Sequence, residues 1–257
     1  IDGFIAQARQ RLAQDPARRE APPNLLEAFI VSAEQEGGKI SDLEIRGNVL
    51  TMLLAGEDTT ANSMAWMLSL LKSHPEQLAR LQREVREAFP PGQAPTMDVL
   101  NRLELMDACI HETMRLMPVA PFLAVQALRE VSINQIRVPR DTIVWTLFRH
   151  DATSERYFEQ AERFEPQRWM SPGDEADKGG VRPNAKGIAM PFGSGPRICP
   201  GRYLALLEIK LCMVMLMRDF DILSVLTDSG GEAGERMSFT MVPDALYMTL
   251  ASRTPSA

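Results

Sequence analysis

The chain has 257 residues, enough for one large domain or two small ones. Apolar residues make up 45% of the sequence and charged residues 24%, which is typical of a globular protein, and the net charge of −6 argues against a nucleic-acid partner. The three cysteines, Cys109, Cys199 and Cys212, are an odd number without C-x-x-C spacing, which argues against a disulfide framework or a zinc site.

Residue 1 is isoleucine rather than methionine, so we expect the natural protein to be longer, or a preceding segment to be disordered or removed. The sequence has no secretory signal and no apolar run long enough to span a bilayer. With the odd cysteine count, this favours a reducing, cytoplasmic compartment and leaves open a membrane anchor before residue 1.

Apolar periodicity predicts helices in the first half of the chain. The predicted helices cover residues 2–14, 25–36, 41–73, 75–89 and 103–116. The third begins at a capping box, Ser41-x-x-Glu44, and the last is stopped by Pro118.

The second half of the chain has a different pattern. Short β-branched runs predict strands within 123–147, and a glycine-rich loop at 192–201 precedes a helix over about 201–218. Residues 237–250 predict a final hairpin. We therefore expect one partial, mainly helical α+β domain over 1–257, with a small segregated β portion.

Cys109 and Cys212 fall among apolar residues of predicted helices, and we expect both to be core thiols.

The loop FGSGPRICPG, residues 192–201, holds Cys199 directly before a helix. A helix N-terminus favours the thiolate form, and the glycines allow a bulky group to approach the backbone. A nucleophilic cysteine needs a histidine base, and none of the three histidines lies in a motif of cysteine hydrolases. Axial ligation of heme iron explains the loop better, and a buried free cysteine is the alternative.

Two further stretches carry polar residues on predicted helices. Residues 55–60, AGEDTT, place a glycine, two acids and two threonines within an apolar predicted helix. An acid beside an alcohol in a groove can relay protons. The alternative interpretation is a polar patch on a solvated face of the helix. Glu112 and Arg115 are spaced to pair on one helix face. The same E-x-x-R spacing recurs at 165–168, where Pro166 predicts a loop.

With these stretches in this order, the chain resembles the C-terminal half of the cytochrome P-450 superfamily of heme-thiolate monooxygenases. The family's loop, F-x-x-G-x-R-x-C-x-G, is matched at every fixed position, by Phe192, Gly195, Arg197, Cys199 and Gly201. The family's oxygen-groove motif, A/G-G-x-D/E-T-T, matches residues 55–60, and its E-x-x-R motif matches Glu112 and Arg115. A further arginine of the family, in a P-E-R-F loop, corresponds to Arg163, with Ala161 in place of the proline.

The resemblance implies roles for these residues around a bound heme b. Cys199 would be the iron ligand, Arg197 would pair with a propionate, and Phe192 would shield the sulfur. The other cofactor-binding positions would be Gly195 and Gly201 in the loop, and Ala55 and Gly56 in the groove. Asp58 and Thr59 would deliver protons during dioxygen activation.

The resemblance also implies structural and substrate-binding positions. Glu112, Arg115 and Arg163 would form a structural network that supports the cysteine loop. The residues implied in substrate contact are Met52, Thr60, Val119, Ala120, Phe122 and Leu123, with the tail hairpin. Many members of the family carry a second propionate-binding basic residue after the E-x-x-R helix, but Val125 and Gln126 stand at that place here. Arg149 and His150 are the candidates that would replace this basic residue.

The activity implied is insertion of one oxygen atom of O2 into an apolar small molecule. The electrons would come from NAD(P)H through a ferredoxin, a flavodoxin or a flavoprotein reductase. A heme-thiolate isomerase or peroxygenase is an alternative, against which the Asp58-Thr59 pair argues. The other alternative is a non-catalytic, truncated heme-binding module.

Overall fold

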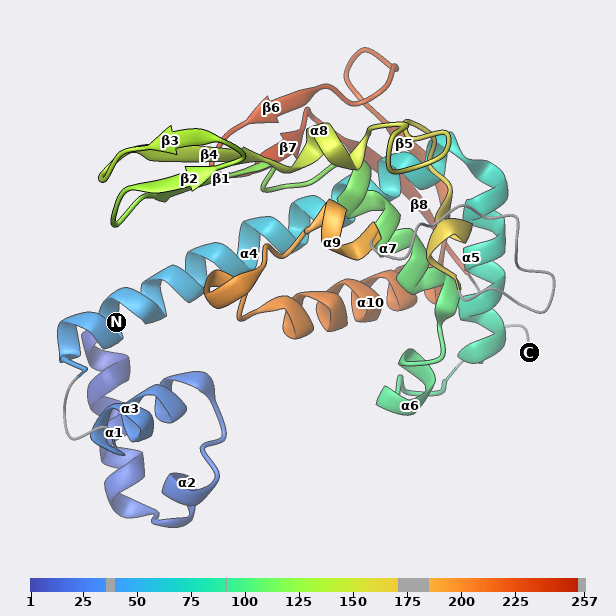
Figure 1. Cartoon of the computed structure of the whole chain (residues 1–257). Coiled ribbons are helices and arrows are strands. Elements are labelled where there is room, and N and C mark those ends of the chain that lie inside the picture. The colour runs from blue at the N-terminus through green and yellow to red at the C-terminus, as the bar shows by residue number, and fades with distance from the viewer. Residues whose placement is uncertain (36–39, 91, 171–184, 254–257) are drawn as a thin grey trace. The chain divides into compact units, whose positions relative to one another are not determined.

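A computed structural model describes residues 1–35, 40–90, 92–170 and 185–253 (Figure 1). Contacts group the chain into two compact units, Ile1–Glu57 and Asp58–Ala257, where one domain was expected. The division falls within the long helix α4 (Asp42–Ser73), and each unit is described by itself. Among the described residues, no helix combines the length and apolar character needed to cross a membrane.

The first unit is helical. It contains α1 (Asp2–Gln14), α2 (Ala17–Glu20), α3 (Leu25–Gln35) and the start of α4. The apolar faces of these helices meet in a core formed by Ile5, Ala8, Leu12, Ile30, Val31, Ala33 and Ile45. The bounds of α1 and α3 agree with the sequence prediction to within one residue.

A buried carboxylate ties this unit together. The side chain of Glu27 is inaccessible to solvent and accepts hydrogen bonds from Arg11 Nε at 2.9 Å, from Arg18 Nη1 at 2.9 and 3.0 Å, and from Asn24 Nδ2 at 3.1 Å. The hydrogen bond from Arg11 is the main cause that lowers the pKa of Glu27 to about 2. The charged form of Glu27 is therefore part of the packed structure.

The predicted capping box begins α4. The Ser41 N–H donates to Glu44 Oε2 at 2.7 Å, and the Glu44 N–H donates back to Ser41 Oγ at 3.3 Å. The bond from the Ser41 backbone lowers the pKa of Glu44. The helix then runs without interruption to Ser73, as the sequence predicted.

Three helices carry most of the core of the second unit. They are α5 (Pro75–Ala88), α7 (Glu104–Leu116) and α10 (Arg202–Asp219). Apolar residues from all three, such as Leu81, Cys109 and Val214, are fully buried in one cluster. In Figure 1, α7 lies between α10 and the short helix α8 (Phe148–Ala152), both of which it contacts. The shorter elements are α6 (Met97–Leu100), η1 (Pro166–Trp169), α9 (Ala185–Ala189) and η2 (Gly195–Arg197).

A carboxylate from α5 fixes the start of α7. Glu84 accepts the backbone N–H of Leu105 at 2.8 Å and that of Met106 at 3.0 Å, so it satisfies donors that a helix N-terminus leaves unpaired. Burial raises the pKa of Glu84, against the opposite effect of these two bonds. This contact positions the helix that carries Glu112 and Arg115.

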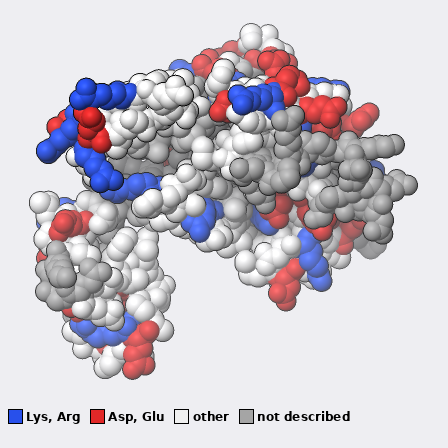
Figure 2. Space-filling model, viewed as in Figure 1, with Lys and Arg blue, Asp and Glu red and all other residues white. Residues whose placement is uncertain are grey.

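The predicted strands form two antiparallel two-stranded sheets, of which only the second joins consecutive strands. One pairs β1 (Phe122–Gln126) with β4 (Ile143–Leu147), and the other pairs β2 (Val131–Ile133) with β3 (Ile136–Val138). Charges of both signs gather on the β2–β3 hairpin (Figure 2), including the exposed pair Arg137–Glu130 at 2.6 Å. Exposed pairs of this kind contribute little to stability.

The tail differs from the sequence prediction of one hairpin over 237–250. A short hairpin does form between β6 (Glu235–Met237) and β7 (Met241–Pro243). The last strand, β8 (Tyr247–Ser252), instead pairs with β5 (Phe220–Leu226), which follows α10 and was not predicted as a strand. β5 and β8 are far apart in the sequence, and the pairing of such strands leaves no local signal because each strand's partner lies elsewhere in the chain.

The two cysteines expected in the core behave differently. Cys109 is fully buried on α7, and burial raises the pKa of its thiol. Cys212 is exposed on α10, so the prediction of a core thiol is wrong there. Apolar residues near Cys212 lie on all faces of α10. Periodicity alone therefore did not separate the buried positions of this helix, such as Met213, from the exposed ones, such as Met215.

Candidate functional site

The loop around Cys199 is held by its own backbone. The Cys199 N–H donates to the carbonyl of Phe192 at 2.9 Å, and the Gly193 N–H donates to that of Met190 at 2.9 Å. Gly193 and Gly195 have φ angles of 70° and 67°, a region that side chains with a Cβ rarely adopt. The glycines are therefore required by the loop, which ends where α10 begins.

Cys199 is a free, half-buried thiol three residues before α10. A Cβ on Gly201 would stand 3.9 Å from its sulfur, and Arg202 Nη1 lies 3.4 Å from its carbonyl oxygen. In the part of the chain that the structure describes, no group of three or more His, Cys, Asp and Glu side chains is arranged to hold a metal ion. A single thiolate is one of the ligands by which proteins hold heme iron, as the sequence predicted for Cys199.

Two other predicted loop residues, Phe192 and Arg197, precede Cys199 in the sequence. Phe192 is partly buried and packs against the main core, so it anchors the loop there. Arg197 is exposed, and no described acidic residue forms an ion pair with it. An exposed guanidinium two residues before the thiol in the sequence fits a ligand with carboxylate groups.

The predicted oxygen-groove residues lie on a continuous stretch of α4. Ala55 and Gly56 belong to the first unit and are exposed, and among the described residues nothing outside the adjacent turns of α4 lies within 4 Å of where a Cβ of Gly56 would stand. Asp58, Thr59 and Thr60 belong to the same unit as Cys199. They become progressively less accessible, from the exposed Asp58 to Thr60 at 7% exposure. The acids Glu57 and Asp58 are both exposed, so neither is a buried charge that needs compensation.

Glu112 and Arg115 form the predicted pair on α7, completely buried. Arg115 donates from Nε and Nη2 to the two oxygens of Glu112, both at 2.8 Å. Its remaining N–H groups bond the carbonyls of Ala152 at 2.6 Å, Ala161 at 2.5 Å and Arg163 at 3.1 Å. The pair therefore joins α7 to α8 and to the segment that follows it.

The structure corrects the third member of this network. The Arg163 side chain is exposed and bonds Gln160 at 2.6 Å, so only its backbone carbonyl takes part. Arg168 occupies the predicted place, with Nε 3.0 Å from Glu112 Oε1 and 6% exposure. Trp169 Nε1 donates to Glu112 Oε2 at 2.7 Å, and the Glu165 N–H donates to Oε1 at 2.9 Å.

A signal for Arg168 was present in the sequence. Residues 166–169, PQRW, place a proline two residues before an arginine and an aromatic residue after it, as in the family's P-E-R-F pattern. AERF at 161–164 lacks the proline. The segment 166–169 forms the short 3-10 helix η1, which turns Arg168 towards Glu112.

The predicted substrate segment lies against the tail. The Met241 N–H donates to the Val119 carbonyl at 2.8 Å, and the Met241 carbonyl accepts Trp66 Nε1 at 3.1 Å. Next to it, Asn62 Nδ2 lies 3.0 Å from Thr240 Oγ1. The turn between β6 and β7 is thereby fixed to both α4 and the segment after α7.

The remaining substrate candidates have mixed surroundings. Ala120 and Leu123 are exposed, while Phe122 is half-buried, with its ring centroid 5.1 Å from that of Trp145. Met52, in the first unit, is half-buried.

The two substitutes for a missing propionate base are not equivalent. Arg149 on α8 forms an ion pair with Glu235 and lies 3.8 Å from Met117 Sδ, so its guanidinium is already engaged. His150, the next residue, is exposed. Val125 and Gln126 are exposed on β1, and neither side chain carries a positive charge.

Comparison with known proteins decides the family. The sequence profile described as "Cytochrome P450" matches residues 1–249. The chain belongs to the cytochrome P450 family. Its mainly helical fold with small sheets is similar to part of the heme domain of cytochrome P450DA, whose crystal structure superposes with a TM-score of 0.72 at 29% identity, over 84% of this chain and 46% of that one. The predicted family and fold class are confirmed.

Curated relatives in the P450 family are longer than this chain. Cytochrome P450 3A11 of Mus musculus is 31% identical over 184 residues, which are 70% of this chain and 34% of that protein. The mitochondrial 1,25-dihydroxyvitamin D(3) 24-hydroxylase of Mus musculus is 33% identical over 190 residues, which are 74% of this chain and 35% of that protein. The chain thus spans about a third of the length of these relatives.

Proposed function

We propose that the whole protein is a heme-thiolate monooxygenase, and that this chain carries its iron ligand, Cys199. The observation that carries the proposal is the cysteine loop, in which two glycines with positive φ and the Phe192–Cys199 backbone bond present a free, half-buried thiol before α10. Heme b, when bound there, would supply the dioxygen chemistry, and the protein would supply orientation and protons.

The loop residues would hold the cofactor by charge and by shape. The thiolate of Cys199 would ligate the iron, and the exposed guanidinium of Arg197 would pair with a propionate. Phe192, anchored in the core, would keep water away from the sulfur. Gly195 and Gly201 would leave space beside the loop, because neither carries a Cβ.

Asp58 and Thr59 would control protons at the site. Asp58 is exposed to solvent on α4, and Thr59, the next residue, is less accessible. An acid followed by an alcohol can pass a proton from water towards a less solvated position. Ala55 and Gly56, one turn earlier on α4, would leave room for the ring.

Substrate and electron donor follow from the same proposal. An apolar small molecule would contact Val119, Ala120, Phe122 and Leu123, together with the β6–β7 turn that bonds Val119, and Met52 and Thr60 on α4. Electrons would come from NAD(P)H through a ferredoxin, a flavodoxin or a flavoprotein reductase. We place this reaction in the cytoplasmic compartment that the cysteine content favours.

The test of the iron ligand uses a matched pair of cysteine variants in the full-length protein. We expect the reduced, CO-bound protein to show the red-shifted Soret band of thiolate ligation. Cys199→Ala should abolish this band, and Cys212→Ala should leave it unchanged, because Cys212 is exposed on α10 away from the loop. An intact band in Cys199→Ala would refute the assignment.

Turnover separates the proposal from its alternatives. A thiolate spectrum with NAD(P)H-driven oxygen insertion in the presence of a reductase supports the monooxygenase. The same spectrum with only peroxide-driven or isomerase activity would show a different heme-thiolate enzyme. Failure of the full-length protein to take up heme would leave a non-catalytic module.

A further inference from the structure

The residue that leads into the cysteine loop has an unusual backbone conformation. Met190 directly follows the last residue of α9 and has a φ angle of 38°, in the left-handed region. The position just after a helix takes this conformation most readily when it holds glycine or asparagine, because a Cβ makes it costly for other residues. Methionine at this position therefore carries local strain, which persists only where surrounding contacts impose it.

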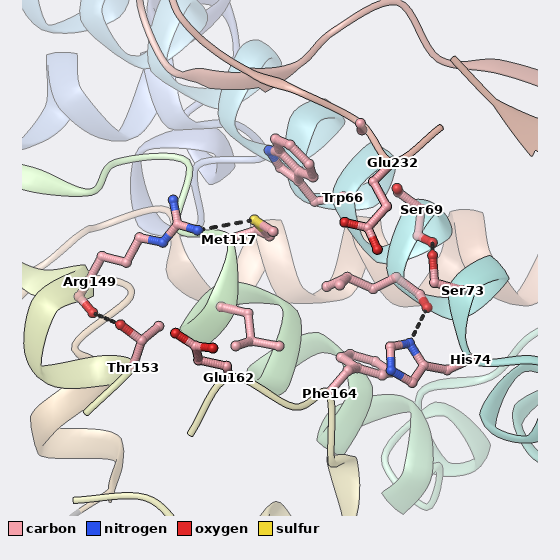
Figure 3. Close-up of a pocket in the computed structure, with 13 residues that line it drawn as sticks. Trp66, Ser69, Ser73, His74, Met117, Arg149, Thr153, Glu162, Phe164 and Glu232 are labelled. Carbon is pink, nitrogen blue, oxygen red and sulfur yellow. Dashed lines mark hydrogen bonds between the residues drawn. The ribbon is translucent and has the colours of Figure 1, made fainter. Parts of the chain in front are cut away.

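Contacts that fix the end of α9 come from α8 and the segment after it. Ala189, the last residue of α9, is 3% exposed and packs in a small core with Phe158, whose ring centroid lies 4.9 Å from the guanidinium carbon of the buried Arg115. On α8, which α9 contacts, Thr153 Oγ1 donates to the Arg149 carbonyl at 2.9 Å (Figure 3) and so secures the end of that helix. The chain therefore leaves α9 from a fixed point.

A tight turn connects this point to the cysteine. The Gly193 N–H donates to the Met190 carbonyl at 2.9 Å, which closes a β-turn with Pro191 and Phe192 at its centre. The Phe192 carbonyl, inside this turn, accepts the Cys199 N–H at 2.9 Å. The conformation of Met190 sets the direction in which the turn starts, so it also sets where the acceptor for Cys199 stands.

The Met190 side chain contributes less than its backbone. It is half-buried, and it is not among the described residues that pack in the main core or in the core around Phe158. The link from α9 to the thiol thus runs through the main chain.

We propose that Met190 is a positioning residue for Cys199, and that it acts through its left-handed backbone conformation. The inference rests on the proposed role of Cys199 as the iron ligand. A residue driven out of this conformation would redirect the Pro191–Phe192 turn and break the hydrogen bond from the Cys199 N–H. The sulfur would then lose its fixed position in the loop.

The test compares three variants of Met190 in the heme-loaded, full-length protein. Glycine and asparagine accept a positive φ angle, whereas valine, which is branched at Cβ, does not. We expect Met190→Gly and Met190→Asn to keep the red-shifted Soret band of the reduced, CO-bound protein. Met190→Val should lower the ratio of the red-shifted to the unshifted CO complex by about tenfold, as expected for backbone strain of this kind.

Met170→Val is the matched control for the loss of methionine. Met170 is also half-buried in the second unit, but its φ of −78° and ψ of 146° suit valine as well as methionine. This variant should keep the band. An equal loss of the band in Met170→Val and Met190→Val would show a general loss of packing and overturn the proposal.

The remaining outcomes also decide the question. Loss of the band in all three Met190 variants would assign the effect to the side chain, and retention in all three would show that Met190 does not position the thiol; either result overturns the proposal. If circular dichroism shows that Met190→Val does not fold, Met190→Gly decides, because its band should resist urea at least as well as the wild-type band. A wild-type protein without a red-shifted band would refute the role of Cys199 itself, and this inference with it.

Discussion

Arg168 Nε and Glu112 Oε1 are 3.0 Å apart, and both side chains are almost completely withdrawn from solvent. The same Glu112 oxygen accepts a hydrogen bond from Arg115 Nη2 at 2.8 Å, so one carboxylate serves two buried guanidinium groups. Arg168 also bonds the carbonyls of Glu159 at 3.1 Å and Gln160 at 3.4 Å. The network therefore fastens the segment 159–169 to α7.

Loss of the Arg168 side chain should destabilise the second unit strongly. Arg168→Ala leaves Glu112 with part of its charge uncompensated in a buried site, which costs about 3–5 kcal/mol of unfolding free energy. Arg163→Ala is the matched control, because that side chain is exposed; its effect should stay within about 0.5 kcal/mol. Urea unfolding of both variants measures the difference, and equal losses would contradict the reassignment.

Acid should destabilise the first unit through Glu27. Its pKa in the folded chain is lowered from 4.5 to about 2, so its contribution is complete above pH 4.5 and is lost as the pH falls towards 2. Glu27→Gln should flatten the dependence of stability on pH across this interval. Thermal unfolding of both proteins between pH 2 and pH 6 measures the effect, and parallel curves would contradict it.

The Asn62–Thr240 hydrogen bond should couple α4 to the tail turn. A double-mutant cycle with Asn62→Ala and Thr240→Val should give an interaction free energy of about 1 kcal/mol in unfolding, as expected for a partly buried bond of 3.0 Å. In the heme-loaded full-length protein, both single variants should also change the ligand-induced spin shift of apolar substrates. Additive unfolding free energies would show that the two residues are not coupled.

Removal of the Thr59 hydroxyl should uncouple electron use from product formation. Thr59→Ala should retain heme and its thiolate spectrum, lower the product-forming rate by about 10²-fold and divert reducing equivalents to peroxide. Ser69→Ala, further along the same helix, is the control and should leave the coupling unchanged. Unchanged coupling in Thr59→Ala would remove this residue from the proposed proton path.

Local patterns in the sequence determined the long helices and the cysteine loop, but not the short helices such as α6 and α8. The Ser41–Glu44 capping box marked the start of α4 to within one residue, and Pro75 and Pro118 marked boundaries of α5 and α7. These signals depend only on residues within one or two helical turns, so they can be identified from the sequence without a tertiary structure. The spacing of FGSGPRICPG is local for the same reason.

Contacts between distant segments were decided only by the tertiary structure. β8 pairs with β5 rather than within the tail, and Arg168 rather than Arg163 reaches Glu112. The exposure of Cys212 likewise depends on which faces other elements cover. Burial and pairing are set by partners tens of residues away, and a side chain's own neighbours in the sequence carry little information about those partners.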